Sequence, residues 1–190
     1  MIDSRHNYED IYKQKSWAYS DKPDPELIRS LVDLPRGKAV DVGGGQGRHS
    51  LALSELGFEV LLVDAAQSGL HQASGAAAER GLNLHVLNTD VGRWEPEDKV
   101  KLAVAALFFH IPARKTSLKI AERIGGALEN GGLLYFSFPG FDKETQEFAD
   151  ELIQASGCAK EWIVKHLVTK KERPRLKVSR RNETRVLAKR

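Results

Sequence analysis

The stretch AVDVGGGQGRHSLAL, Ala39 to Leu53, places four glycines within five residues, between an apolar run and a helix-like one. Glycine lets the backbone adopt a positive φ and lets a ligand approach without a Cβ in the way. The N-terminus of the following helix would offer unpaired N–H groups and a positive potential, which suit a phosphate or a carboxylate. The stretch therefore predicts a strand, a ligand-binding turn and a helix, in that order.

Two common patterns of nucleotide binding do not fit this turn. A dinucleotide site requires Gly-x-Gly-x-x-Gly/Ala, but the last position is Arg48 when counted from Gly43 and Ser50 when counted from Gly45. A P-loop requires Gly-Lys-Ser/Thr, and no such triplet follows the glycines. The pattern that does fit is Asp41 followed by Gly-x-Gly-x-Gly.

The rest of the chain alternates between helix-like and strand-like segments. Helices are predicted at residues 8–15, 24–34, 46–56, 67–80, 114–129 and 142–156, and strands at 38–42, 58–63, 82–88, 100–107, 133–138, 161–170 and 176–188. Asp24 is expected to cap its helix, with Pro25 at the first helical position.

This order of segments predicts the fold class. Strands separated by helices of about ten or more residues require a parallel sheet with helices on both faces. After Gly157, two strand-like segments follow each other with no room for a helix, so they must pair antiparallel. We therefore expect an α/β, Rossmann-like, seven-stranded and mostly parallel sheet with a C-terminal antiparallel β-hairpin.

Composition excludes several classes of protein. The chain has 190 residues, of which 41% are hydrophobic and 29% charged, as in globular domains. The longest apolar run, residues 102–109, is far shorter than the roughly 20 residues of a membrane span. Cys158 is the only cysteine, and the histidines are scattered, so neither a disulfide nor a metal site is expected. We expect a cytoplasmic protein without a membrane partner.

The motif DVGGGQG, Asp41–Gly47, resembles the first motif of class I S-adenosylmethionine-dependent methyltransferases. Supporting features follow in order: the second strand ends at Asp64, the third runs into Asp90 and Val91, and a final strand and hairpin close the sheet. The resemblance covers residues 23–190. Within the class, the chain is similar to small members such as the tellurite-resistance (TehB-like) methyltransferases.

The resemblance implies S-adenosyl-L-methionine as the cofactor. In the family, the carboxylate after the second strand accepts hydrogen bonds from the ribose hydroxyls, and the residues after the third strand bind adenine. The residues expected to bind the cofactor are Asp41, Gly43, Gly44, Gly45, Gly47, Asp64, Ala65, Asp90, Val91 and Leu107. The resemblance also implies one methyltransferase domain over residues 1–190, in which residues 1–22 form a cap over the cofactor.

The methyl acceptor is expected to bind just past the fourth strand, where the family's acceptor site opens. His110 is the candidate general base, because a neutral imidazole is available near pH 7. Trp17, Tyr19 and Phe109 are candidates for lining the acceptor pocket, and His166 is a further candidate on the hairpin. For His110, a purely structural role in its loop remains a second interpretation.

Three functions remain open at this point. The leading one is methylation of a small-molecule O, N or S nucleophile, because the chain has little room for a separate recognition domain. The second is methylation of RNA or protein, since residues 159–190 hold 12 Lys and Arg against 3 acidic residues; these charges would also serve to protect an exposed sheet edge. The third is a non-catalytic nucleoside-binding module. The acceptor and the oligomeric state are left undetermined.

Overall fold

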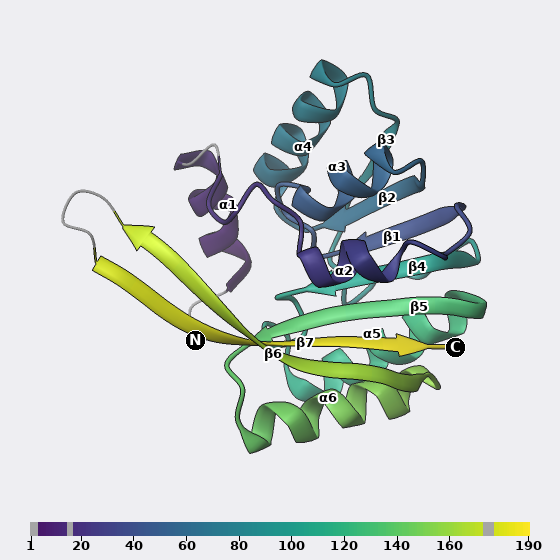
Figure 1. Ribbon diagram of the computed structural model, residues 1–190. Coiled ribbons are helices and arrows are strands. Elements are labelled where there is room, and N and C mark those ends of the chain that lie inside the picture. Colours follow the sequence, from purple (N-terminus) through teal and green to yellow (C-terminus); the bar gives the residue numbers. More distant parts are fainter. Residues whose placement is uncertain (1–3, 15–16, 173–176) are drawn as a thin grey trace.

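The computed structural model describes the backbone of residues 4–14, 17–172 and 177–190, and the side chains of 8–14, 17–161 and 183–190 (Figure 1). The elements are α1 (Ser4–Gln14), α2 (Pro25–Ser30), β1 (Lys38–Val42), α3 (Arg48–Glu55), β2 (Glu59–Asp64), α4 (Gln67–Glu79), β3 (Leu84–Asn88), β4 (Val100–Ala106), α5 (Arg114–Ala127), β5 (Leu128–Pro139), α6 (Lys143–Ser156), β6 (Ala159–Glu172) and β7 (Lys177–Lys189). Each segment predicted from the sequence corresponds to one of these elements.

The strands form one sheet in the order β3-β2-β1-β4-β5-β7-β6. β1 to β5 are parallel, whereas β7 pairs antiparallel with both β5 and β6. The predicted fold class is therefore confirmed. The strand order reverses between β1 and β4, and in open parallel sheets ligands bind beyond the carboxyl ends of the strands at such a point.

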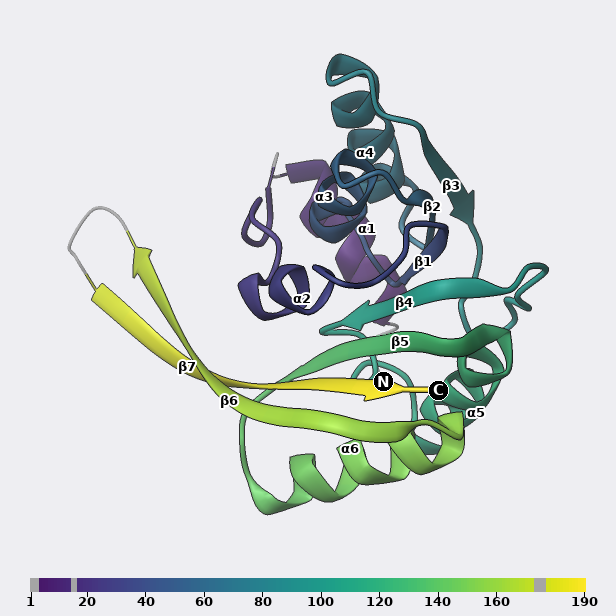
Figure 2. The same ribbon diagram turned by 45° about the vertical axis from the view of Figure 1, so that its right-hand side comes forward.

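Helices cover both faces of this sheet (Figures 1 and 2). α2, α3 and α4 lie on one face and α5 and α6 on the other, because side chains alternate between faces along each strand. In β5, for example, Leu133 and Tyr135 pack with α2 and α3, whereas Leu134 and Phe136 pack with the core under α5 and α6. The two apolar layers fix the sheet and, with it, the edge where the strand ends meet.

The connection from β3 to β4 contains no helix in the described structure. Arg123 of α5 holds it instead, donating hydrogen bonds to the carbonyl oxygens of Trp94 at 2.6 Å and Gly92 at 3.0 Å. Trp94 is 7% exposed and packs in the core on the α5 side. These contacts keep the loop after β3 close to the sheet without a covering helix.

The prediction of a helix over residues 24–34 capped by Asp24 was wrong in two respects, although Pro25 does lie at the start of this helix. α2 ends at Ser30 instead of residue 34, and the Asp24 side chain makes no capping hydrogen bond. Its carboxylate is buried, and it accepts a hydrogen bond from the Tyr135 hydroxyl at 2.7 Å. Asp142, by contrast, caps α6 by accepting the Thr145 N–H at 2.8 Å. The Asp24 carboxylate thus accepts a hydrogen bond from Tyr135, which is distant in the chain, instead of from a backbone N–H of its own helix.

Over the described residues, the helices are too short or too polar to cross a membrane. Within the same residues, no group of three His, Cys, Asp or Glu side chains is arranged to hold a metal ion.

Candidate functional site

The glycine turn joins β1 to α3 at the carboxyl edge of the sheet. Gly43 and Gly45 have φ values of 66° and 55°, a region that L side chains rarely adopt. A Cβ on Gly43 would lie 2.2 Å from the Phe108 ring, and one on Gly45 would lie 2.3 Å from the Tyr12 hydroxyl. The turn therefore requires glycine for its backbone conformation and for the close approach of two aromatic side chains.

Asp41 lies behind the turn and is 1% exposed. One carboxylate oxygen accepts a hydrogen bond from the Ser50 hydroxyl at 2.7 Å, while Oδ1 has no hydrogen-bond donor among the described residues. Burial raises the pKa of Asp41 above its usual value, against the effects of His49 and Ser50. A Cβ on Gly44 would lie 2.6 Å from the Asp41 carboxyl carbon. Asp41 therefore connects the end of β1 with the first turn of α3, on the two sides of the glycine turn.

Asp64, the last residue of β2, is bonded directly to the glycine turn. One carboxylate oxygen accepts the Gly45 N–H at 2.8 Å, and the other accepts the Ala66 N–H at 2.8 Å. Burial raises the pKa of Asp64, while these two N–H groups act in the opposite direction. Ala65 is exposed beside them. The Ala65 N–H also interacts with this carboxylate, which still keeps a lone pair that can accept a hydrogen bond from a ligand hydroxyl.

Asp90 and Val91 follow β3 at the same edge. β2 and β3 are parallel with Asp64 opposite Asn88, so Asp90 lies two residues beyond this pair. The Asp90 carboxylate accepts the Gly92 N–H at 2.9 Å, which fixes a tight turn. Val91 is 5% exposed and packs in the core. The fold thus brings the two predicted carboxylates, Asp64 and Asp90, to neighbouring strand ends.

Leu107 follows β4 and has a φ of 54°, the only positive value of a non-glycine residue in the described chain. Such a conformation costs an L residue roughly 1–2 kcal/mol. The Leu107 N–H donates to the Ser137 carbonyl oxygen at 3.0 Å and lies 3.1 Å from the Ser137 hydroxyl. The resulting bend directs Phe108 onto Gly43. Backbone strain of this kind is concentrated at functional sites.

The N-terminal helix α1 packs on α4 and over the glycine turn (Figure 1). The Glu9 carboxylate accepts hydrogen bonds from the Ser68 N–H at 3.0 Å and from its hydroxyl. The Gln72 amide donates to the Tyr12 carbonyl oxygen at 2.6 Å. Tyr12 is 6% exposed, and its burial, with the nearby Asp64 charge, raises the pKa of its phenol far above the usual value.

Gln46, inside the glycine turn, is a site residue that the sequence did not identify. Its amide oxygen accepts the Ala18 N–H at 2.7 Å, and its amide nitrogen donates to Gln72. A lone polar side chain in a turn of glycines was the available signal, but its partner lies 28 residues away. Trp17, beside Ala18, is partly buried, whereas Tyr19 is 50% exposed.

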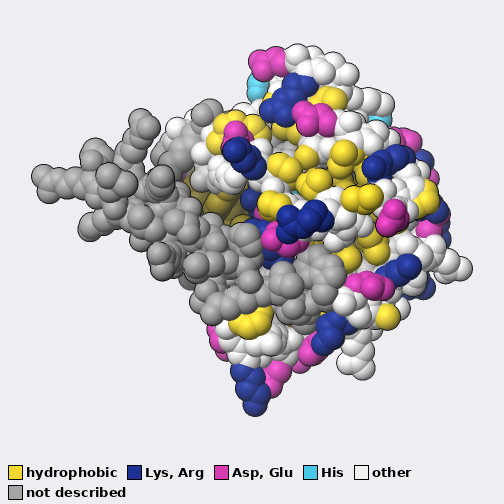
Figure 3. Space-filling view, in the orientation of Figure 1, with side chains coloured by type: hydrophobic (Ala, Val, Ile, Leu, Met, Phe, Trp, Pro, Cys, Tyr) yellow, Lys and Arg dark blue, Asp and Glu magenta, His cyan; other side chains and the backbone are white. Residues whose placement is uncertain are grey.

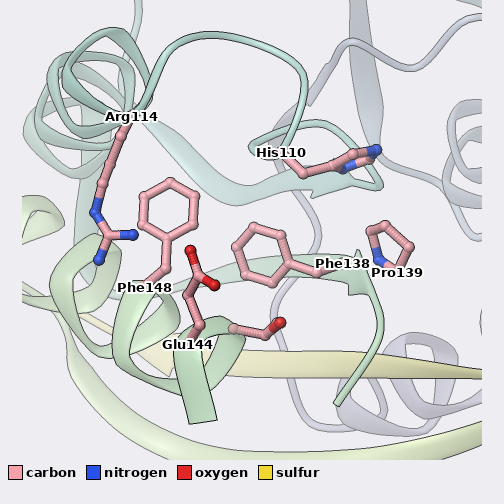
Figure 4. A pocket seen from close by; sticks show the side chains of 7 residues that line it. His110, Arg114, Phe138, Pro139, Glu144 and Phe148 are labelled. Atoms are coloured by element: carbon pink, nitrogen blue, oxygen red, sulfur yellow. The ribbon is translucent and has the colours of Figure 1, made fainter. Parts of the chain in front are cut away.

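A small pocket opens beside His110, between the loop after β4, the end of β5 and the first half of α6 (Figure 4). It is lined by His110, Arg114, Phe138, Pro139, Glu144, Thr145 and Phe148. Partial loss of water around the imidazole lowers the pKa of His110 below its usual value. The burial of Phe109 argues against its predicted place in an acceptor pocket: the ring is fully buried and packs edge-on against Phe136. The side chain of His166 lies outside the described residues.

A buried ionic cluster lies behind the glycine turn and connects α2 and α3 with β7. Asp24 pairs with Arg48, the first residue of α3, at 3.4 Å and with Arg185 of β7 at 3.3 Å. Arg185 is also paired with Glu26, and with Glu183 at 3.1 Å. Arg48 therefore has a structural partner inside the protein.

Comparison with known proteins adds three solved structures of similar fold. TehB from Haemophilus influenzae superposes with a TM-score of 0.74 at 16% identity, over 96% of this chain and 67% of that one. The N-methyltransferase NodS from Bradyrhizobium japonicum, solved with S-adenosyl-L-homocysteine, gives 0.75 at 13% identity over 98% of each chain. An S-adenosylmethionine-dependent methyltransferase from Clostridium acetobutylicum gives 0.71 at 14% identity, over 97% of this chain and 96% of that one.

Comparison by sequence gives one further finding. Residues 39–132 match the family model described as a methyltransferase domain, and this range runs from β1 into β5. None of the curated proteins compared matches the chain.

Proposed function

Because this chain carries a methyltransferase domain on the class I, S-adenosylmethionine-dependent fold, we propose that it methylates an oxygen, nitrogen or sulfur atom of a small molecule. The observation that carries the proposal is the position of the two predicted carboxylates, Asp64 and Asp90, at strand ends beside the glycine turn. The His110 pocket opens at the end of β4, the strand next to β1.

The proposed cofactor site consists of Asp41, Gly43, Gly44, Gly45, Gly47, Asp64, Ala65, Asp90, Val91 and Leu107. The residues fit the cofactor because Asp64, which accepts the Gly45 N–H, retains a lone pair for the ribose hydroxyls. Asp41 is buried, so its proposed contribution is to hold the turn. When bound, S-adenosyl-L-methionine supplies a methyl group on a positively charged sulfur.

In the proposed reaction, the protein aligns the acceptor with this methyl group and removes a proton from it. Alignment of two reactants contributes up to about 7–11 kcal/mol. The His110 imidazole, kept neutral by its lowered pKa, accepts the proton of a hydroxyl, amine or thiol. No metal ion enters the proposal.

The position of the N-terminal segment favours a small methyl acceptor. We propose that residues 1–22 form a cap on the cofactor site, with Trp17 and Tyr19 on its acceptor side. Of the described part of this segment, Glu9 and Tyr12 are bonded to α4 and Ala18 is bonded to Gln46. Such a cap excludes water from the methyl group and leaves a limited space for an acceptor.

Calorimetry with S-adenosyl-L-homocysteine, followed by an acceptor screen with labelled S-adenosyl-L-methionine, tests the proposed function. Binding together with turnover of a phenol, amine or thiol is the expected result. Failure to bind S-adenosyl-L-homocysteine would eliminate the proposed cofactor site. Binding without turnover across all three panels would instead favour a non-catalytic nucleoside-binding role.

Asp64→Ala is expected to weaken binding of S-adenosyl-L-homocysteine by about 1.5–3 kcal/mol, or roughly 10- to 150-fold, because charge-assisted hydrogen bonds to the ribose are lost. Calorimetry measures the affinity. Asp98→Ala is the matched control, since Asp98 is an exposed carboxylate paired with Lys38 at the other end of β1. Unchanged affinity in a folded Asp64→Ala variant would contradict the ribose assignment.

Methylation of RNA is a second candidate function, favoured by the shape of the hairpin. β6 and β7 continue past Pro139, the last β5 residue that pairs with β7, and project from the body (Figures 1 and 2). In the sequence, residues 166–182 hold seven Lys and Arg and one acidic residue. On the face seen in Figure 3, described basic and acidic side chains are interspersed. RNA binding with a steep salt dependence would support this candidate, and no binding at low salt would remove it.

A further inference from the structure

The pocket beside His110 has an aromatic floor. Phe138 and Phe148 form it, with their ring centroids 5.5 Å apart, and Pro139 forms the side toward His110. In Figure 4 the His110 imidazole lies above Pro139, on the side of the pocket away from Arg114. Flat apolar walls of this kind accept a ring or a short hydrocarbon chain.

Glu144 is the acidic side chain that lines this pocket. Its carboxylate is directed toward the gap between the two phenylalanine rings (Figure 4). The side chain is exposed, and it interacts electrostatically with Arg114 of the same lining, whose pKa it helps to raise. A carboxylate beside an apolar wall attracts a cation that comes to lie there, because the wall excludes part of the screening water.

Arg114, the one cationic side chain of the lining, is already committed to another acid. Its guanidinium donates two hydrogen bonds to Glu151, at 3.0 and 2.9 Å, and stacks over the Phe148 ring at 4.6 Å. Residues 142–151, which include the first half of α6, hold five acidic residues and one lysine. Three of these acids are paired with cations, Glu147 with Lys143, Asp150 with Lys160 and Glu151 with Arg114. Glu144 therefore carries the negative charge of the lining, and the neutral His110 adds no positive charge.

We propose that the methyl acceptor combines an apolar ring or chain with a positively charged group, and that Glu144 binds this charge. The proposal rests on the proposed function and names its substrate class. Phe148 and Pro139 hold the apolar part, so that the nucleophilic atom is presented near His110. The charged group is separate from the methylated atom, because a protonated amine has no lone pair with which to attack.

The reaction at this site conserves atoms and electrons. A lone pair of the acceptor atom forms the new bond to the methyl carbon while the carbon–sulfur bond breaks and its electron pair returns to sulfur. The proton leaves the acceptor atom for the His110 imidazole and passes from there to water. Glu144 takes no part in bond making and acts only by binding the acceptor.

The test uses acceptor triplets that share one nucleophile and differ in charge. Tyramine, 4-ethylphenol and 3-(4-hydroxyphenyl)propionate form the phenol triplet, and the same side chains on aniline and thiophenol form two more. Binding to the full chain saturated with S-adenosyl-L-homocysteine is measured by calorimetry, and turnover with labelled S-adenosyl-L-methionine. The cationic member is expected to bind about fivefold more tightly than the neutral one, as for an ion pair open to water.

Glu144→Gln is expected to remove this preference and leave the neutral member's affinity unchanged. Glu147→Gln is the control and should retain the preference for the cationic acceptor. Glu147 lies one turn further on α6, outside the pocket, and is paired with Lys143. The inference is overturned if neutral or anionic members bind equally well, or if no cationic member binds while S-adenosyl-L-homocysteine does. Loss of S-adenosyl-L-homocysteine binding itself would be a failure of the proposed function instead.

Discussion

Changing His110 to glutamine is expected to lower the turnover number by about 10²–10⁴-fold, the usual contribution of a general base, while the affinity for S-adenosyl-L-homocysteine stays unchanged. Glutamine retains a polar side chain of similar length but cannot take up a proton near neutral pH. Steady-state kinetics and calorimetry on the same preparation separate the two effects. His85→Gln, a change at an exposed histidine of β3, should leave both values as they are.

The pH dependence of turnover provides a second measurement of the same role. Desolvation lowers the pKa of His110 below its usual value of about 6.5, so the imidazole is in its base form at pH 7. The midpoint of the decline in turnover toward acid pH should therefore lie below about 6.5. A rate equal to that of the parent, or the same acid limb in His110→Gln, would show that His110 is not the base.

Arg185→Met is expected to destabilise the protein by about 3–5 kcal/mol, because it leaves the buried Asp24 carboxylate with an incomplete set of partners. The Arg185 side chain is 5% exposed, and Asp24 and Glu183 lie within 3.3 Å of it. Denaturant unfolding at pH 7 measures the loss. Arg29→Met is the matched control: Arg29 also pairs with Glu26 but is 69% exposed, so at most about 1 kcal/mol should be lost.

The stability difference between Arg185→Met and the parent should depend on pH in a defined direction. Burial alone would raise the pKa of Asp24, but His49, Arg48 and Arg185 outweigh it and hold the pKa well below its usual value. A carboxylate with a depressed folded-state pKa stabilises fully above its unfolded pKa, about 3.9, and loses this contribution at lower pH. The difference should thus be largest near pH 7 and shrink toward pH 3. A difference that grew in acid would contradict this account.

The sequence by itself determined the features that depend on near neighbours in the chain. Alternating strand and helix patterns predicted every element and the antiparallel hairpin, because the period of apolar residues and the chain breaks are local signals. The glycine spacing excluded a dinucleotide site and a P-loop. Asp64 and Asp90 were found because they lie at the ends of the second and third predicted strands, and parallel strands bring such ends to one edge.

Only the tertiary structure decided the features that depend on partners distant in the chain. β7 lies between β5 and β6, Asp24 bonds to Tyr135 instead of its own helix, and Gln46 reaches Ala18. Phe109 is inside the core, and Glu144 comes to lie in one pocket with His110. The local sequence pattern indicates whether a side chain requires burial, a hydrogen bond or an opposite charge. Packing decides which of several distant groups becomes its partner, since only the folded chain brings the competing partners within contact distance.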